Sequence, residues 1–211
     1  MRTVLLHGLG QTAKDWEDVV SRIPAGEVDC PELFAEMTGE VSYSRLLADL
    51  EHRYAGTAEP LRLCGLSLGA LLAMDYTIRH PDEVASLVLI ATQYKAPRLL
   101  IDCQNLLFRC MPGRSFSGMG ISKSDAIALA RSMRSLDFTA RLGEIVCPVV
   151  ILCGERDRVN LRASRRLQEL LPDATLHVVP GAGHELNRAA PDAIADALDP
   201  GTPGAPTGLL G

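Results

Sequence analysis

The sequence predicts an α/β fold, a mostly parallel sheet of about six strands flanked by helices. Short runs rich in Val, Leu and Ile alternate along the chain with stretches in which apolar residues recur every three or four positions. Such alternation is typical of parallel strands joined by helical crossovers. Hydrophobic residues make up 47% of the 211 residues and aromatic residues only 4%, a composition that fits strands covered on both faces.

The first half of the chain alternates regularly between the two patterns. Apolar runs that stop at glycine, proline or polar residues predict strands at 3–6, 27–30, 61–64 and 84–91. The segments between them predict helices at 14–20, 43–54 and 68–78. The helix at 68–78 follows the strand at 61–64 with almost no intervening loop, so the chain must turn sharply there.

The second half departs from this alternation once. Further strands are predicted at 148–153 and 175–179, and helices at 161–171 and 191–198. The chain between the strands at 84–91 and 148–153 is too long for a simple crossover, and we interpret residues 94–140 as an inserted cap that contains a helix at 124–136. We expect one domain over residues 1–199, followed by a flexible Pro/Gly-rich tail at 200–211.

Composition and charge argue against nucleic-acid binding and membrane insertion, and they indicate where the protein is located. The net charge of −5 argues against a nucleic-acid-binding protein, which is usually basic. A membrane span is not expected because no run of about 18 apolar residues occurs. The N-terminal apolar run is too short for a signal peptide, so we expect a cytoplasmic protein. Its six cysteines are scattered singly and are expected to be free thiols.

The strand-to-helix junction carries the motif Gly65-Leu66-Ser67-Leu68-Gly69. A serine held at the tip of such a turn adopts strained backbone angles, and glycines on either side leave room for it. The N–H groups of the following helix could bind an oxyanion. By itself the motif also fits a glycine-rich turn with a bystander serine.

An acid and a histidine follow the serine in an informative order. Asp157 comes just after the strand at 148–153, and His184 lies in a loop after the strand at 175–179. The carboxyl ends of parallel strands meet at one edge of the sheet. A serine hydroxyl needs a base to take its proton, and that base needs an acid to orient it. The order Ser, Asp, His therefore predicts a nucleophilic site.

The chain resembles the α/β-hydrolase family over residues 3–198. The likeness is carried by Val4-Leu5-Leu6-His7-Gly8, Gly65-Leu66-Ser67-Leu68-Gly69, Arg79-His80-Pro81, Cys147-Pro148, Gly154-Glu155-Arg156-Asp157 and Gly183-His184. These segments are highly specific together, although each alone is common. The chain differs from the usual pattern in starting at the His-Gly strand, without the antiparallel strands that commonly come first, and in its short cap.

The resemblance implies a role for each of five residues. Ser67 is the expected nucleophile, His184 the base and Asp157 its orienting acid, with Glu155 as the nearest rival acid. The backbone N–H groups of Leu9 and Leu68 are the expected oxyanion hole. His7, near that loop, is expected to be structural.

Within this family the sequence most resembles small esterases, enol-lactonases and their carbon–carbon-cleaving relatives. The expected activity is cofactor-independent and metal-free hydrolysis of a small or medium carboxylic ester, thioester or lactone. One alternative is carbon–carbon cleavage of a carboxylate-bearing substrate by the same residues. Another is a hydrolase-like ligand receptor without catalysis. Two interpretations of the cap stay open. Its apolar residues pack among themselves and its arginines point into water, or the apolar residues line the pocket and arginines bind a substrate carboxylate. The candidates for the second role are Arg98, Phe108, Arg109, Met111 and Arg114.

Overall fold

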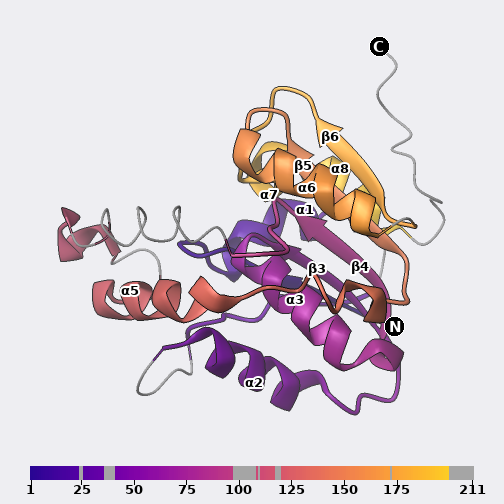
Figure 1. Ribbon diagram of the computed structural model, residues 1–211, viewed down its shortest axis with the longest axis horizontal. Helices are drawn as coiled ribbons and strands as arrows, with labels where there is room; N and C mark the ends of the chain where they lie inside the picture. The colour runs from indigo at the N-terminus through magenta and orange to yellow at the C-terminus, as the bar shows by residue number, and fades with distance from the viewer. Residues whose placement is uncertain are drawn as a thin grey trace.

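The computed structural model describes residues 1–23, 26–35, 41–96, 108, 110–116, 120–171 and 173–199. Its centre is a six-stranded sheet in the order β2-β1-β3-β4-β5-β6, in which every neighbouring pair is parallel (Figure 1). The strands are β1 (Arg2–Leu6), β2 (Glu27–Asp29), β3 (Leu61–Leu66), β4 (Val84–Ile90), β5 (Val149–Gly154) and β6 (Thr175–Val179). The α/β prediction is therefore confirmed, with strand ends within two residues of those expected.

Helices cover both faces of the sheet. They are α1 (Glu17–Val20), α2 (Tyr43–Tyr54), α3 (Leu68–Arg79), α5 (Lys123–Ser132), α6 (Arg158–Leu170), α7 (Leu186–Ala189) and α8 (Pro191–Leu198). The expected helix at 14–20 is instead a 3-10 turn, Ala13–Trp16, that continues into α1. No helix within the described ranges is long and apolar enough to cross a membrane.

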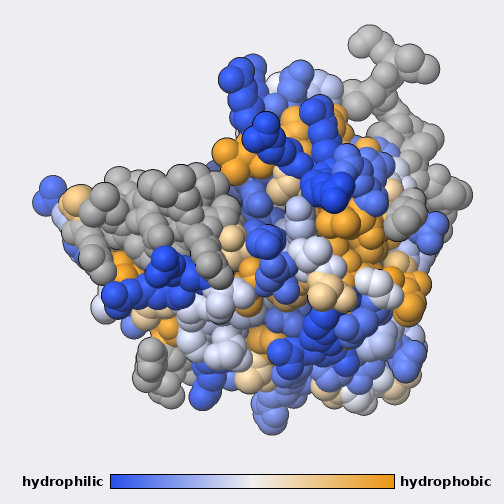
Figure 2. Space-filling view, viewed as in Figure 1, coloured by the Kyte–Doolittle hydropathy of each residue, from blue (hydrophilic) through white to orange (hydrophobic). Residues whose placement is uncertain are grey.

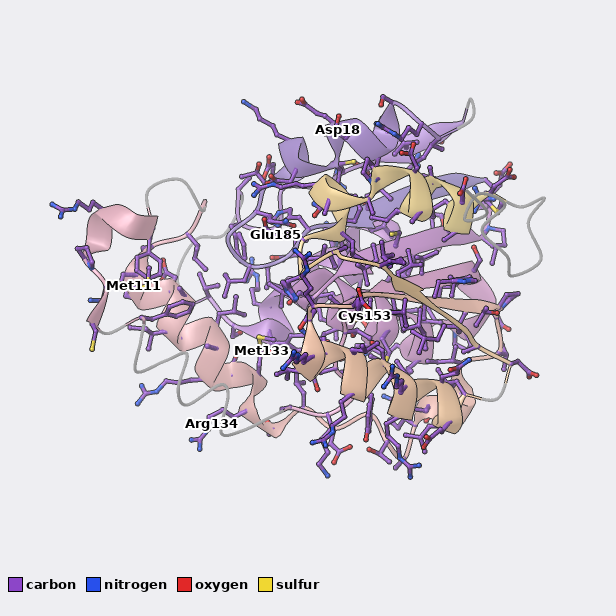
Figure 3. The ribbon with its side chains drawn as sticks, turned by 90° about the horizontal axis from the view of Figure 1, so that it is seen from above. Asp18, Met111, Met133, Arg134, Cys153 and Glu185 are labelled. Carbon is purple, nitrogen blue, oxygen red and sulfur yellow. The ribbon has the colours of Figure 1, made fainter. Side chains whose placement is uncertain are left out.

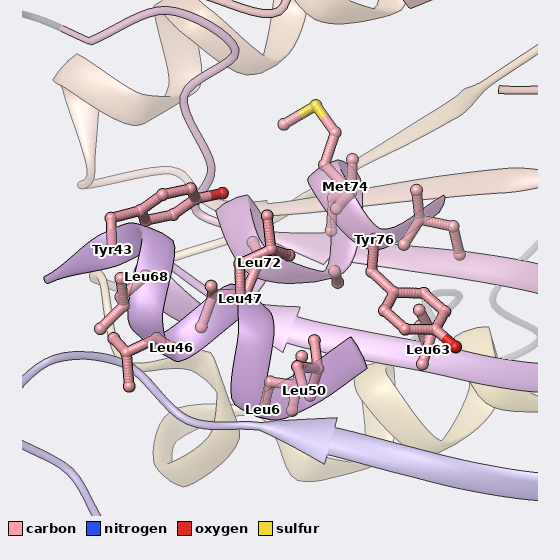
Figure 4. Packing of buried hydrophobic residues seen from close by; sticks show 14 of the residues in the cluster. Leu6, Tyr43, Leu46, Leu47, Leu50, Leu63, Leu68, Leu72, Met74 and Tyr76 are labelled. Carbon is pink, nitrogen blue, oxygen red and sulfur yellow. The ribbon is translucent and has the colours of Figure 1, made fainter. Parts of the chain in front are cut away.

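Alternating strand residues build two separate cores. Leu63 of β3 and Leu87 of β4 face α2 and α3, and this larger core includes Leu47 and Leu72 (Figure 4). Their chain neighbours, such as Cys64, face the opposite side and pack with α1, α7 and α8. The four central strands, β1, β3, β4 and β5, are therefore mostly buried on both faces, as expected for a parallel sheet, while the edge strands β2 and β6 are partly exposed.

Side-chain caps fix where two helices near the site begin. The hydroxyl of Ser122 accepts a hydrogen bond from the backbone N–H of Asp125 and caps α5. Asp157 caps α6 in the same way, accepting from the N–H of Asn160 at 3.4 Å. The outer face of α6 is strongly basic, and its hydrophilic side chains are visible in Figure 2. The exposed arginines there are Arg158, Arg162, Arg165 and Arg166.

The expected cap insertion is closed at its base by a short pairing. Lys95 and Asp137 form an antiparallel bridge, and the N–H of Phe138 donates to the carbonyl of Tyr94 at 2.9 Å. Between these two segments α5 extends away from the sheet (Figure 1). The division into one domain with a cap over 94–140 stays a prediction, and the expected tail at 200–211 lies outside the described residues.

Candidate active site

Ser67 stands alone between the last residue of β3 and the first residue of α3. Its φ of 54° and ψ of −108° lie in a region that residues with a side chain rarely adopt. The turn is held from the sheet, because the Ser67 N–H donates to the carbonyl of Ile90 in β4 at 2.9 Å. A backbone conformation so strained points to a functional reason for the position of this residue.

The two glycines of the motif are required by space. A Cβ on Gly65 would lie 2.5 Å from the backbone nitrogen of Ala70, and one on Gly69 would lie 2.9 Å from the carbonyl oxygen of His7. Atoms at these separations overlap. The tight turn therefore brings the start of α3 against the end of β1, where the expected oxyanion loop begins.

His184 and Asp157 meet at the ends of β6 and β5. The Nδ1 atom of His184 lies 2.6 Å from Oδ2 of Asp157. An ionised carboxylate can only accept, so Nδ1 carries the proton and Nε2 is left with a free lone pair. The Asp157 side chain is 11% exposed and that of His184 is 43% exposed. The imidazole is thus oriented by a largely buried acid and remains accessible from solvent.

Three interactions keep Asp157 ionised. Burial acts to raise its pKa, but hydrogen bonds from His184 and Asn160 and the proximity of His184 outweigh this effect and leave the pKa below the ordinary aspartate value. Asn160 Nδ2 lies 3.0 Å from Oδ1 and 2.8 Å from Oδ2 of the carboxylate. Asn160 was not predicted from the sequence as a site residue.

Glu155, the rival acid, is used elsewhere. Its Oε2 accepts a hydrogen bond of 2.8 Å from the N–H of Gly181 and so braces the loop after β6. Cys153, at the end of β5, is a second reactive group near the acid, but burial raises the pKa of its thiol to about 11. All described cysteines are free thiols: Cys30, Cys64, Cys110, Cys147 and Cys153.

The expected oxyanion loop follows β1 and is tied down by buried polar groups. The backbone N–H of Gln11 donates to the carbonyl of Gly8 at 3.2 Å. The side-chain Oε1 of Gln11 accepts from the backbone N–H of Gly8, also at 3.2 Å. Its Nε2 donates to Oδ1 of buried Asn187 in α7 at 3.1 Å. These contacts fix the turn that contains Leu9 relative to the segment just after His184.

His7 has the structural position that we expected. It is fully buried, and its Nε2 accepts from the N–H of Leu33 at 3.1 Å, while Nδ1 lies 2.9 Å from the Gly8 carbonyl. Burial lowers the pKa of His7, so it is neutral in the fold at neutral pH. It joins the loop after β2 to the loop after β1.

A cavity of about 330 Å³ brings the predicted residues together. Ser67, His184, Leu9 and Leu68 all contribute to its wall. Most of the remaining wall is apolar, with the amides of Gln93 and Asn160 as polar exceptions. The other lining residues are Leu71, Ala91, Ala96, Ala130, Met133, Leu136 and Val159. Leu68 is the first residue of α3, where helix N–H groups have no partner within the helix.

The predicted cap residues that the structure describes lie outside the cavity lining. Arg98 and Arg109 lie outside the described residues. Phe108 packs edge-on against Phe116, with ring centroids 5.4 Å apart, and Met111 packs on the larger core. Arg114 is an exposed residue of the 3-10 turn Gly113–Phe116. Their role as a substrate wall stays a prediction.

Apart from Ala96, the described cap residues that line the cavity come from α5 and the segment after it. Ala130, Met133 and Leu136 belong to the wall. Figure 3 shows Met133 close to the body of the molecule and Met111 farther out along the extended segment. Within the described ranges no group of three or more His, Cys, Asp or Glu side chains could hold a metal ion.

A strand-to-helix serine at the edge of a parallel sheet, facing a cavity shared with a histidine, is the architecture of α/β-type hydrolases. The chain belongs to the alpha/beta hydrolase family, whose model matches residues 3–197. It is accordingly an enzyme of the hydrolase class.

Relatives extend over most of the chain. It is 29% identical to the pimeloyl-(acyl-carrier protein) methyl ester esterase of Chromobacterium violaceum, over 86% of both chains. The enol-lactonase from Burkholderia xenovorans LB400 is similar in structure, with a TM-score of 0.79 and 16% identity over 93% of this chain and 89% of that one. A thermophilic esterase from Thermogutta terrifontis gives a TM-score of 0.75 and 20% identity over 94% and 88%. The two structural likenesses show the fold.

Proposed function

We propose that the protein is a serine hydrolase that cleaves a small or medium carboxylic ester, thioester or lactone through an acyl-enzyme on Ser67. One observation carries this proposal. A strained serine opens into the same cavity as His184, and His184 is hydrogen-bonded through Nδ1 to a buried carboxylate. The three side chains are of the types that nucleophilic catalysis by serine requires, and the shared cavity and the Asp157–His184 hydrogen bond support this assignment.

The chemistry follows from which atoms hold protons. His184 Nε2 takes the Ser67 hydroxyl proton as Oγ attacks the substrate carbonyl carbon, and Asp157 stabilises the resulting imidazolium. The N–H groups of Leu9 and Leu68 donate to the developing oxyanion. When the tetrahedral adduct collapses, the leaving alcohol or thiol receives the proton from His184. A water activated by the same imidazole then releases the acid and restores Ser67.

The cavity supports the choice of substrate size. Its volume of about 330 Å³ is near the lower end of the range for small-molecule sites, and its wall is mostly apolar. An acyl group of modest length fits such a wall. The curated relative from Chromobacterium violaceum is an esterase, which favours an ester among the three bond types. The free thiols support a cytoplasmic location.

A fluorophosphonate probe tests whether Ser67 is activated. The wild-type protein is expected to be labelled and to hydrolyse p-nitrophenyl esters, with the fastest rates for short or medium acyl chains. Ser67→Ala should lose both properties, with a loss in turnover on the order of 10⁶-fold by analogy with other serine hydrolases. Ser44→Ala, at an exposed position of α2, is the matched control and should behave as wild type. Retained labelling in folded Ser67→Ala would contradict the proposal.

A further inference from the structure

Asn160 contacts the carboxylate of Asp157 beside His184, and both side chains approach the same oxygen, Oδ2. Its Nδ2 lies within hydrogen-bonding distance of both carboxylate oxygens of Asp157, at 3.0 and 2.8 Å. Its Oδ1 accepts a hydrogen bond of 2.6 Å from Nε2 of Gln93, in the segment after β4. The segments that follow β4, β5 and β6 are thus linked. Gln93 contacts Asn160, and both Asn160 and His184 contact the Asp157 carboxylate.

We propose that Asn160, oriented by Gln93, is a positioning residue that fixes the Asp157 carboxylate and through it the His184 ring. The inference rests on the proposed function, because it assigns Asp157 as the acid that orients the base. Neither amide is among the residues that the sequence singled out. Both line the cavity, so the linked side chains extend from the acid to the substrate-facing wall.

The charge on Asp157 sets the direction of every hydrogen bond in this arrangement. A carboxylate accepts only, so Asn160 must present its NH₂ group to Asp157 and its oxygen to Gln93. Gln93 must then present its own NH₂ group to Asn160. The 3.2 Å approach between Asn160 Nδ2 and His184 Nδ1 joins two donors, so it is a close contact, and the Nδ1 proton goes to Asp157 at 2.6 Å.

The burial of Asp157 explains why its carboxylate needs the hydrogen bonds from Asn160. The carboxylate is 11% exposed while the imidazole that it orients is 43% exposed and lies in a loop. Without Asn160, one acceptor position on each carboxylate oxygen would lose its side-chain donor in a place that water reaches poorly. The carboxylate would keep the backbone N–H of Asn160 and the His184 ring as partners, and it would hold the imidazole less firmly. Small errors of this kind reduce turnover more than they reduce binding.

Four variants and one matched control distinguish a positioning role of Asn160 and Gln93 from a role in packing. Asn160→Ala is expected to lower kcat by about 10-fold or more, by a similar factor for short and long acyl esters. Gln93→Met keeps the size of the side chain and removes its donor, so a smaller loss is expected. Gln93→Glu and Asn160→Asp place a second acceptor-only group in the arrangement, so each should reduce kcat more than the neutral substitution at its position. Gln168→Met, on α6 outside the cavity lining, is the matched control and should leave kcat unchanged.

A double-mutant cycle and a spectroscopic signal complete the test. If Gln93 acts through Asn160, Gln93→Met will have no further effect in the Asn160→Ala background. The downfield proton NMR resonance of the His184–Asp157 hydrogen bond should shift or broaden in Asn160→Ala and stay in place in the Gln168→Met control. Wild-type kcat in Asn160→Ala, an unmoved resonance, or additive losses in the double variant would overturn the inference. The resonance does not depend on turnover, so a failure of the proposed function at Ser67 would be recognised separately.

Discussion

Replacing Gly154 by alanine should push the loop that carries His184 away from Asp157 by a distance that the structure predicts. Gly154 ends β5, three residues before Asp157, and lies against the loop that carries His184. A Cβ at this position would lie 2.5 Å from the carbonyl oxygen of Ala182 and closer still to that of Gly183. Ordinary contact begins near 3.4 Å, so the loop must move by about 1 Å, a displacement that can lower turnover about 10²-fold.

We expect Gly154→Ala to lower kcat by about 10²-fold and to reduce the free energy of unfolding by about 1–3 kcal/mol, the usual cost of overpacking. A domain of this size is typically stable by about 5–15 kcal/mol, so the variant should remain folded at 25 °C. Steady-state kinetics on a p-nitrophenyl ester and urea unfolding followed by circular dichroism measure the two effects. The measurements must be made on the same preparation.

Gly143→Ala is the matched control, because a Cβ on Gly143 would have no atom within 4 Å. Its kcat and its stability should stay close to those of the wild type. The reasoning fails if Gly154→Ala is destabilised as expected but keeps wild-type kcat. That result would mean that the loop can shift without moving the His184 ring relative to Ser67.

The remaining predictions concern the choice of Asp157 as the acid and the effect of pH. Asp157→Asn should lower kcat by about 10⁴-fold, because the wrong histidine tautomer is favoured, yet stay folded, because asparagine caps a helix equally well. A greater loss in Glu155→Gln would reverse the choice of acid. Since burial lowers the pKa of His7, the unfolded chain protonates first, and stability should fall below about pH 6.5 by up to about 1.4 kcal/mol per pH unit. Urea titrations should show a flatter pH slope in His7→Gln, and an equal slope would contradict this explanation.

Patterns that depend on neighbouring residues could be predicted from the sequence. The strand at 175–179 and the helices at 43–54 and 191–198 have the predicted ends in the structure, because each is a clear apolar run or helical stripe bounded by turn residues. The close approach of Asp157 and His184 was also foreseeable, since the carboxyl ends of parallel strands share one edge of the sheet.

Contacts between polar residues from distant segments were not predicted. The helix after Asp157 was expected to begin at Leu161, its first apolar residue, but α6 begins at Arg158. Its first turn places Arg158, an exposed Val159 and Asn160 before Leu161, so apolar periodicity gives no sign of it. An aspartate followed three residues later by a side chain able to return to it was the available signal. The contact of Gln11 with Asn187 joins opposite ends of the chain and left no local pattern.

The order of the strands also determines when catalytic competence can arise during folding. Ser67 belongs to the part of the sheet built by residues 2–90, whereas Asp157 and His184 follow β5 and β6. Parallel β4 and β5 pair side by side although residues 91–148 lie between them in the chain, and such non-local pairing forms slowly. Under the proposed function, the segment that forms the Ser67 turn is therefore synthesised well before His184, its proposed base. The onset of ester hydrolysis would then mark the pairing of β5 and β6 with the rest of the sheet. A chain arrested before β5 pairs would hold Ser67 without His184 beside it.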